Sequence, residues 1–289
     1  MTTLEANGIV YSLAVLPNGN LASGDASGDR GGVIKIWNTV NSSLIRTLTA
    51  NGLPFSLAVL PNGYLASGVG SGVIKIWDTD DSTRNDPITT INAHYNYVYA
   101  LAVLQNGYLA SGSDDYSIKI WNSTDWSSIR TLAANSQVWS LAVLPNGYLA
   151  SGDENGNIKI WSTNNGSLIR TLSSNSAVRS LAVLPNGFLA SGEYNGNIKI
   201  WDTDDSASNG PITTINSAHG DYVNALAVLQ NGYLASGSDD QTIKIWNSTD
   251  WSQTLIRTLT GNGFVFALAV LQNGYLASGS TDATIKIWG

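Results

Sequence analysis

The sequence contains no cysteine, and its only two histidines are His94 and His219. Without cysteine the chain forms no disulfide and carries no thiol nucleophile. Two histidines far apart in the sequence give too few ligands for a zinc site, which usually takes four cysteine, histidine or carboxylate side chains. We therefore expect neither a metal centre nor any other bound cofactor.

Charged residues are also scarce. They make up 12% of the 289 residues, and the net charge is −7, with an isoelectric point near 4.6. An acidic chain matches neither nucleic-acid phosphates nor anionic membranes, so we expect neither as a partner. Each of the seven lysines lies in a separate copy of one short motif, so they form no basic patch. We expect their aliphatic stems to lie along a sheet and their ammonium groups to reach water.

Long apolar runs are missing as well. No stretch approaches the roughly 20 apolar residues that a membrane-spanning helix needs. The first residues, MTTLEANGIV, lack the basic start and apolar centre of a secretory signal. On these grounds we expect a cytoplasmic protein, and we take a monomer as the default.

What the sequence does contain is one motif repeated seven times. At residues 101–121 it reads LAVLQNGYLASGSDDYSIKIW, with two apolar runs around a turn, a polar loop, and a third apolar run that ends in tryptophan. Copies of LAVL begin, 40 to 45 residues apart, at Leu13, Leu57, Leu101, Leu141, Leu181, Leu226 and Leu268. Copies of IKIW end at Trp37, Trp77, Trp121, Trp161, Trp201, Trp246 and Trp288. A fixed period of this length is typical of repeat proteins whose units pack on one another.

Each repeat reads as four short strands. LAVL and YLASG are joined by Asn-Gly, the dipeptide that best supplies the positive φ angles of a tight hairpin. IKIW follows after a loop of small polar residues, and a fourth run such as LIRTL or PITTI leads into the next unit. Four antiparallel strands in about 40–45 residues correspond to one blade of a β-propeller.

The chain resembles the WD-repeat β-propeller family over essentially its whole length, with literal Trp-Asp pairs at Trp77-Asp78 and Trp201-Asp202. The resemblance implies an all-β fold, a seven-bladed β-propeller with four antiparallel strands in each blade. Because the repeat is unbroken, we expect residues 1–289 to form a single domain.

The two ends of the chain predict how the ring closes. The last repeat stops at IKIWG and lacks a fourth strand, while the first residues TTLEANG resemble RTLTANG at residues 46–52. We therefore predict that residues 2–5 supply the outer strand of the last blade. Closure of this kind couples the two termini and removes an unpaired strand edge.

The repeats fall into two kinds. The third and the sixth carry a histidine seven residues before LAVL and an aspartate six residues before the tryptophan. In the WD-repeat family, His, Ser, Asp and Trp side chains at these offsets form a hydrogen-bonded network. The resemblance therefore implies two structural networks: His94, Ser111, Asp115 and Trp121, and His219, Ser236, Asp240 and Trp246. Such a network stabilises a fold when every buried member has a partner.

The other five repeats instead carry an asparagine six residues before LAVL, at Asn7, Asn51, Asn135, Asn175 and Asn262. The family network cannot be assigned there, and we expect these side chains to cap the turn locally. Repeats two and three share long connections with repeats five and six, which indicates duplication of several blades at once. Recent amplification and deliberate design both account for such close similarity.

The pattern favours a protein that is not an enzyme. The two histidine–aspartate pairs lie three repeats apart, and nothing in the pattern resembles a catalytic set of nucleophile, base and orienting residue. The acidic loops at residues 78–81 and 202–205 lack the glycine turn and the distal glutamate of a calcium loop. The insertion at residues 25–32 is open to two interpretations, a contact loop or a mobile flap.

One end of the ring is the candidate binding face. The loops before the first strand and between the second and third strands share it, and in WD-repeat proteins it is the usual docking surface. Two residues before each LAVL the uniform repeat varies, with Tyr11, Phe55, Tyr99, Trp139, Arg179, Asn224 and Phe266, which we call the first column. The second column lies two residues earlier, at Ile9, Leu53, Tyr97, Gln137, Ala177, Tyr222 and Phe264. Strand alternation places both columns on the same side.

Carboxylates from the loops between the second and third strands are expected at the same end: Asp114, Asp115, Glu154, Glu193, Asp239, Asp240 and Asp282. Aromatic rings beside carboxylates favour cationic groups. The leading hypothesis is therefore a non-catalytic scaffold that binds a protein or peptide, with a basic segment favoured. The alternatives are rings that serve packing alone, a lectin-like propeller that binds carbohydrate, and an amplified or designed propeller with no evolved ligand.

Overall fold

The short apolar runs of each repeat fold as β-strands. The structure is a computed structural model of residues 1–289 and describes all of them except residues 28–30, 205–207 and 249–253. In the described residues there is no helix, and 28 strands form seven four-stranded sheets. The expected all-β, seven-bladed propeller is confirmed.

Two strands of each blade lie nearest the axis of the ring. The innermost strands are β2 (Val10–Val15), β6 (Pro54–Val59), β10 (Val98–Val103), β14 (Val138–Val143), β18 (Val178–Val183), β22 (Val223–Val228) and β26 (Val265–Val270). The second strands are β3 (Leu21–Asp25), β7 (Leu65–Val69), β11 (Leu109–Ser113), β15 (Leu149–Asp153), β19 (Leu189–Glu193), β23 (Leu234–Ser238) and β27 (Leu276–Ser280).

The other two strands complete each blade toward the rim. The third strands are β4 (Val33–Asn38), β8 (Val73–Trp77), β12 (Ser117–Trp121), β16 (Asn157–Trp161), β20 (Ile198–Trp201), β24 (Thr242–Trp246) and β28 (Thr284–Trp288). The outer strands are β5 (Ser43–Thr49), β9 (Thr89–Asn92), β13 (Ser128–Ala133), β17 (Leu168–Ser173), β21 (Thr213–Ile215), β25 (Leu255–Thr260) and β1 (Thr2–Glu5).

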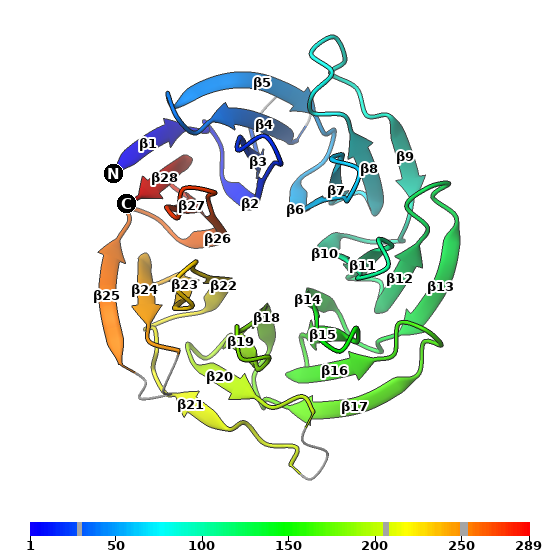
Figure 1. Ribbon diagram of the computed structural model, residues 1–289, viewed down its shortest axis with the longest axis vertical. Coiled ribbons are helices and arrows are strands. Elements are labelled where there is room, and N and C mark those ends of the chain that lie inside the picture. Colours follow the sequence, from blue (N-terminus) through cyan, green and yellow to red (C-terminus); the bar gives the residue numbers. More distant parts are fainter. Residues whose placement is uncertain (28–30, 205–207, 249–253) are drawn as a thin grey trace.

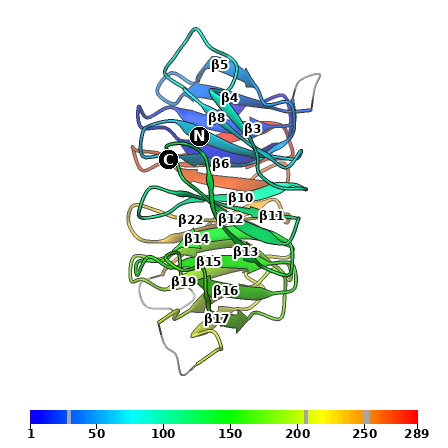
Figure 2. The ribbon, with the colours of Figure 1, turned by 90° about the vertical axis from the view of Figure 1, so that its right-hand side faces the viewer.

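The blades follow one another around the axis in chain order (Figure 1) and form a disc when seen edge-on (Figure 2). Within a blade each strand pairs antiparallel with the next; in the third blade Leu101 pairs with Ser111, and Ser111 pairs with Lys119. The Asn-Gly turn between the first two strands has Gly107 at a φ of 84°, which glycine adopts without strain. The turn chemistry read from the sequence thus sets the hairpin.

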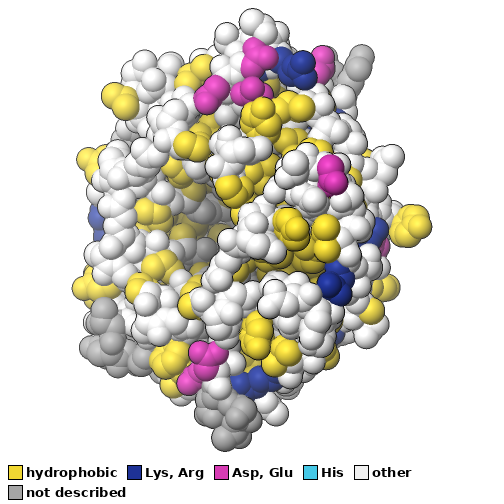
Figure 3. Space-filling view, turned by 45° about the vertical axis from the view of Figure 1, so that its right-hand side comes forward, with side chains coloured by type: hydrophobic (Ala, Val, Ile, Leu, Met, Phe, Trp, Pro, Cys, Tyr) yellow, Lys and Arg dark blue, Asp and Glu magenta, His cyan; other side chains and the backbone are white. Residues whose placement is uncertain are grey.

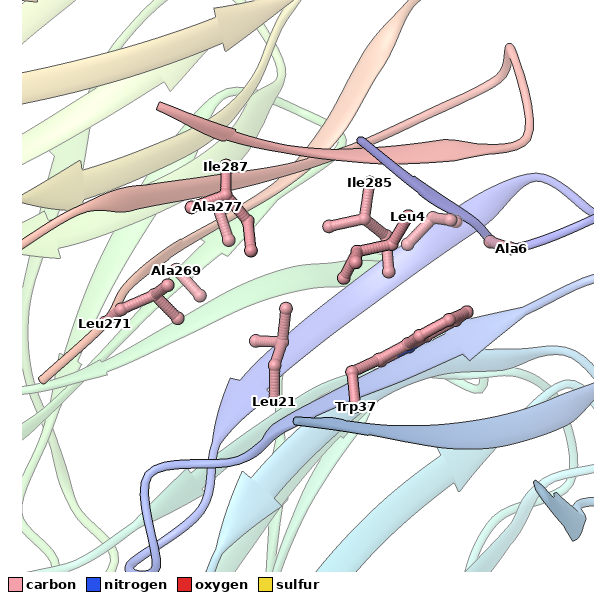
Figure 4. Packing of buried hydrophobic residues seen from close by; sticks show 10 residues of the cluster. Leu4, Ala6, Leu21, Trp37, Ala269, Leu271, Ala277, Ile285 and Ile287 are labelled. Atoms are coloured by element: carbon pink, nitrogen blue, oxygen red, sulfur yellow. The ribbon is translucent and has the colours of Figure 1, made fainter. Parts of the chain in front are cut away.

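The first strand closes the ring as expected. β1 pairs antiparallel with β28 and becomes the outer strand of the last blade. Leu4 of β1 is buried in one cluster with Ile285 and Ile287 of β28 and with Trp37 of the first blade (Figure 4). The two ends of the chain therefore lie side by side at the rim (Figure 1).

The hydrophobic core is divided into clusters between blades. Between the first and second blades, Ile34 and Ile36 of β4 pack with Leu65, Val69 and Trp77 of the next blade. Corresponding clusters fill the other six interfaces. Because side chains alternate along a strand, the isoleucines of IKIW face one neighbouring blade and the tryptophan faces the other.

A side-chain hydrogen bond joins the second and third strands of every blade. Trp121 Nε1 donates to Ser111 Oγ at 2.9 Å, and the equivalent pair recurs in all seven blades at 2.8 or 2.9 Å. The indole nitrogen is therefore paired although the ring is buried. We predicted this bond only in the third and sixth blades, although its signal in the sequence, the serine of each LASG motif, is present in all seven.

The prediction that the lysine ammonium groups reach water is wrong. Lys159 Nζ donates to the backbone carbonyl of Ala134 and lies 3.2 Å from Asp153 Oδ2. Three further ion pairs of this kind are Lys35–Asp25 at 3.4 Å, Lys199–Glu193 at 3.1 Å and Lys286–Asp282 at 3.4 Å. The ammonium group is thus paired inside the protein, because IKIW places lysine on the same buried face as its tryptophan.

The asparagines before LAVL do not mainly cap their turns with side chains. Four of the five, Asn7, Asn51, Asn135 and Asn175, have φ angles between 52° and 62°. Asparagine tolerates this left-handed conformation better than most residues. Within the described part of the chain, the one side-chain cap among them is at Asn175, whose Oδ1 accepts a hydrogen bond from Ser173 Oγ at 3.2 Å. The left-handed backbone conformation therefore explains why asparagine occurs at these four positions.

Two loops singled out from the sequence are only partly described. Residues 28–30 of the insertion at residues 25–32 lie outside the described residues, and both interpretations of that loop stay open. In the first acidic loop, Asp78 Oδ1 accepts backbone hydrogen bonds from Asp80 and Asp81 at 3.0 and 3.1 Å, so this carboxylate braces its own loop. Residue 205 of the second acidic loop lies outside the described residues.

Deletion of residues 1–6 should destabilise the whole ring, because the last blade loses its outer strand and the closing interface loses Leu4. Burial of one leucine contributes about 1.5–3 kcal/mol, so we expect the deletion to lower the free energy of unfolding by at least that much in urea titrations. Leu4→Ala should cost about 2–5 kcal/mol. The exposed neighbour Thr3→Ala should change the stability by less than about 0.5 kcal/mol. An unchanged melting temperature after the deletion would contradict closure by β1.

Asp153→Asn should cost about 3 kcal/mol or more of unfolding free energy, because it leaves the Lys159 ammonium half-compensated inside the protein. Glu154→Gln is the matched control: it changes the same charge one residue later, at an exposed position, and should shift the stability by less than about 0.5 kcal/mol. Chemical denaturation of the two variants gives the comparison. Equal stabilities would show that the ion pair contributes nothing to the fold.

Candidate functional site

A β-bulge at the start of each innermost strand positions the first column. In the third blade Val98 pairs with Ser113 and Ala100 pairs with Gly112, so Tyr99 is left opposite no residue of β11. All seven innermost strands show this shift, and in every case the extra residue belongs to the first column. A bulge bends the strand and re-aims the side chain of the extra residue. The same backbone device therefore presents seven different side chains.

The seven first-column side chains line one cavity at the mouth of the central channel: Tyr11, Phe55, Tyr99, Trp139, Arg179, Asn224 and Phe266. The cavity has a volume of about 230 Å³. At about 30 Å³ each, it has room for roughly eight water molecules. Pockets for drug-sized ligands are larger, about 300–1,000 Å³. The cavity therefore suits one side chain or one terminal residue of a partner.

Aromatic rings form one continuous side of this pocket. Tyr11 lies between Phe266 and Phe55, with ring centroids 5.7 Å and 5.0 Å away, and Phe55 contacts Tyr99 at 5.4 Å. These four residues come from blades seven, one, two and three. Edge-to-face and stacked contacts at such distances favour the arrangement they adopt. The rings therefore pack on one another and face the cavity at the same time.

Arg179 and Asn224 form the polar side. The Arg179 guanidinium lies 5.0 Å from the ring centroid of Trp139 and 5.9 Å from that of Tyr222. Burial lowers its pKa, while the negative charge of Asp239 opposes that change. Asn224 Nδ2 donates to Asp239 Oδ1 at 2.6 Å, which holds the carboxylate beside the pocket. Arginine stays protonated at neutral pH, so the polar side carries a cation.

Two carboxylates stand close behind the pocket wall. Burial raises the pKa of Asp239, and hydrogen bonding from Asn224 and the charge of Arg179 oppose the rise. Burial likewise raises the pKa of Asp114, although a hydrogen bond from Asn96 counters it. The same desolvation, followed by the charge of Asp114, raises the pKa of Tyr99 to about 12. Tyr99 therefore stays a neutral phenol at neutral pH.

The second column lies around the first rather than in the pocket lining. Tyr97 contacts the rings of Phe55 and Tyr99 at 5.6 and 5.8 Å. Tyr222 stacks on Tyr194, with centroids 3.7 Å apart. Both columns lie on one face, and the second column with Tyr194 extends the aromatic surface outward from the pocket.

Most carboxylates expected at this face have partners within the protein. Asp115 and Asp240 contact the two histidines, and Glu193 and Asp282 pair with lysines. Glu193 ends β19, at the expected end of its blade, but it is fully buried there. Asp114 and Asp239 accept hydrogen bonds from asparagine side chains. Glu154 is exposed, in the loop between β15 and β16.

The pocket continues into the channel below it. A second cavity, of about 210 Å³, is lined by serines and leucines of the innermost strands and shares Tyr99, Arg179 and Phe266 with the first. The serine hydroxyls are paired; Ser12 Oγ donates to the carbonyl of Pro54 in the next blade at 2.7 Å. Leucine side chains such as Leu181 therefore supply its unpaired, apolar surface.

The structure brings the predicted network of the third blade together. His94 Nδ1 lies 2.9 Å from Asp115 Oδ2, and His94 Nε2 lies 2.7 Å from Ser111 Oγ. Ser111 Oγ also accepts the bond from Trp121. With a neutral imidazole, Ser111 Oγ donates to His94 Nε2 and the other ring nitrogen donates to the carboxylate. Ser117 Oγ adds a bond to Asp115 at 2.6 Å. In this series of hydrogen bonds every side chain has a partner when the imidazole is neutral.

The sixth blade repeats this geometry. His219 Nδ1 lies 2.9 Å from Asp240 Oδ2, and Nε2 lies 2.7 Å from Ser236 Oγ, which accepts from Trp246 at 2.8 Å. Burial alone would raise the pKa of Asp240, but hydrogen bonds from His219 and Thr242 bring it well below the usual range. Both networks lie outside the pocket lining. Their polar groups form hydrogen bonds with one another, as expected for a network with a structural role.

The described residues contain no group of three or more histidine, cysteine, aspartate or glutamate side chains able to hold a metal ion. None of the described segments forms a helix long and apolar enough to cross a membrane. On the face shown in Figure 3 the basic side chains are scattered singly around a hollow at the centre of the ring. That face therefore offers no continuous cationic surface.

The third-blade network should make stability depend on pH. Burial lowers the pKa of His94 below its usual value of 6.5, against the pull of Asp115. The unfolded chain therefore takes up a proton near pH 6.5 that the folded protein resists, and stability falls as the pH falls through that value. At about 1.4 kcal/mol per pKa unit, the loss at pH 5 is at most about 2 kcal/mol.

Urea unfolding at pH 7 and at pH 5 tests this expectation. His94→Gln should lose part of the difference between the two pH values, because the titrating group is gone. The contribution of Asp115, whose pKa is held low, disappears only below about pH 4 and does not enter this window. An identical pH dependence in the wild type and the variant would contradict the neutral state of His94.

Comparison with known proteins agrees with the repeat seen in the structure. The family model described as WD domain, G-beta repeat, matches residues 1–38, 85–122, 126–162, 166–202, 210–247 and 253–289. The matched segment 85–122 joins the outer strand β9 to the three inner strands of the following blade. The match passes over residues 39–84, where the structure nevertheless contains β5 to β8 in the same arrangement.

Among solved structures, the crystal structure of the WD40 β-propeller domain of Doa1 is similar to 100% of this chain over 95% of its own length. The TM-score is 0.85 and the sequence identity is 24%, so this likeness concerns the fold. No curated protein sequence matches the chain. Because the family model covers well over half of the residues, the chain belongs to the WD40 repeat family.

Proposed function

We propose that this protein is a non-catalytic scaffold that binds a segment of another protein over the channel mouth. WD40 propellers are generally protein-interaction scaffolds. The observation that carries the proposal is the convergence of all seven first-column residues on one cavity. The repeat is otherwise nearly uniform, so its variation is concentrated where a ligand would make contact.

The chemistry of the mouth suits a peptide. The rings of Tyr11, Tyr99 and Trp139 are half-buried, which gives large contact areas that lose little conformational freedom on binding. Interfaces draw most of their affinity from such aromatic and arginine anchors in well-packed pockets. The exposed carboxylates of Glu154 and Asp221, in loops at the same end of the blades, support a basic segment outside the pocket. The proposed contact is thus an anchor residue at the centre and polar flanks around it.

The double variant Trp139→Ala, Tyr99→Ala should lose binding of peptides that the wild type selects from a displayed library of random sequences. We expect affinity to fall by at least about thirtyfold, since truncation of a central anchor costs about 2 kcal/mol or more. Tyr95→Ala is the control: this tyrosine is 97% exposed and lies outside the pocket lining. Its affinity should equal that of the wild type. Binding is measured by fluorescence anisotropy.

Stability measurements separate binding from packing. If the double variant no longer unfolds cooperatively, the rings serve packing, and the milder pair Trp139→Phe, Tyr99→Phe then has to show the loss of affinity. A glycan array probed with the wild type tests the carbohydrate alternative. Selection of no peptide, together with signal on the array, would replace the peptide scaffold with a lectin.

A further inference from the structure

Arg179 is the one charged residue among the seven that line the pocket. At the same bulge the other blades place an aromatic ring, or asparagine in the sixth blade. The backbone shift is the same in each case, so the guanidinium enters the pocket by the same geometry that aims the rings. The pocket is therefore an aromatic cup with a single cation in its wall.

Two aromatic rings lie close to this cation, and its N–H donors are open. Trp139 and Tyr222 lie against the guanidinium at 5.0 and 5.9 Å. Among the described residues, no carboxylate forms an ion pair with it and no acceptor forms a hydrogen bond with it. None of the Arg179 nitrogen atoms is both buried and without a partner. Its unpaired N–H groups are therefore accessible from the pocket. A guanidinium held beside aromatic rings, with its N–H groups free, can bind a carboxylate through two parallel hydrogen bonds.

A cavity with both leucine and serine residues in its lining adjoins the cation. The channel cavity of about 210 Å³ shares Arg179 with the pocket and is lined by leucines, among them Leu141 and Leu181. The neighbouring hydroxyl of Ser180 is already bonded to the Val223 carbonyl at 3.4 Å. A ligand that reaches Arg179 thus finds an anion site next to a recess in which leucine side chains supply the apolar part of the lining.

We infer that the pocket binds the C-terminal residue of a partner polypeptide, with its free carboxylate on Arg179 and an apolar side chain in the leucine-lined channel. The inference rests on the proposed function and names the part of the partner that is recognised. A terminal residue carries a carboxylate and a side chain on the same Cα atom, which matches an anion site beside an apolar recess. A ring closed by seven side chains also admits a chain end more readily than a chain passing through.

Two features of the pocket sharpen this assignment. An internal aspartate or glutamate would satisfy Arg179 but would leave the leucine-lined recess empty, so it fits less of the site. Asp239 lies near the guanidinium without forming an ion pair, and its Oδ1 accepts from Asn224 at 2.6 Å. The negative charge of Asp239 cancels much of the long-range attraction between Arg179 and an anion. An anion is therefore held at this site only if it forms direct hydrogen bonds with Arg179.

The test uses two peptide libraries with the same random residues, one displayed with a free C-terminus and one in which the random residues are internal. Selected peptides are then synthesised with a free carboxylate and with a terminal amide, and their affinities are measured for the wild type, Arg179→Lys and Arg179→Met. We expect amidation to weaken binding to the wild type about ten- to hundredfold. It should have little effect on Arg179→Met, and Arg179→Lys should lie between, since lysine keeps the charge without the fork.

The outcomes separate this inference from the proposed function. Enrichment of free C-termini with apolar last residues, lost on amidation only when Arg179 is present, supports it. Enrichment of internal peptides with equal affinity as acid and amide would overturn it and leave the scaffold intact, and internal acidic peptides that depend on Arg179 would assign the site to a side-chain carboxylate. Failure of both libraries would overturn both proposals. The melting temperature of Arg179→Met shows that the variant is folded.

Discussion

Every blade must bury both of its faces, and the alternation within IKIW meets this requirement. The two isoleucines pack on one neighbouring blade, while the lysine and the tryptophan turn to the other. The second face therefore contains an indole N–H and an ammonium group that need partners. The LASG serine pairs the indole in all seven blades, and a backbone carbonyl, often with a carboxylate, pairs the ammonium. The histidine networks extend this solution in two blades.

The bulge separates this burial requirement from the variable surface. Residues on either side of it, such as Val98 and Ala100, keep their places in the sheet and the core. The inserted residue opposes none, so its size and charge can change while the ladder stays the same. Seven copies of a nearly identical unit can therefore carry seven different side chains at the mouth. The bulge therefore allows the blades to be uniform while the residues that line the pocket differ.

The sequence predicted those features of the fold for which a residue pattern has a single physical explanation. Period, Asn-Gly turns and the likeness of residues 2–5 to a fourth strand predicted the ring and its closure. The varied column before LAVL predicted which residues line the mouth. Simple alternation could not reveal the bulge, because no residue type marks it, and so both columns were placed equally. The lysines were assigned to solvent, and the burial of Glu193 was not foreseen, because a pairing between separate strands has no local signature in the sequence.

The mouth is asymmetric although the ring repeats. Aromatic residues of blades seven, one, two and three form one arc, and Arg179 with Asn224 forms the opposite side, with Trp139 between them. A symmetric cup would accept a ligand in seven equivalent orientations and hold none of them selectively. One cation in the wall removes that degeneracy, because a polar group of the ligand then has one favoured position and its apolar part is directed away from it. Orientation thus requires only one departure from the aromatic pattern, and the fifth blade provides it.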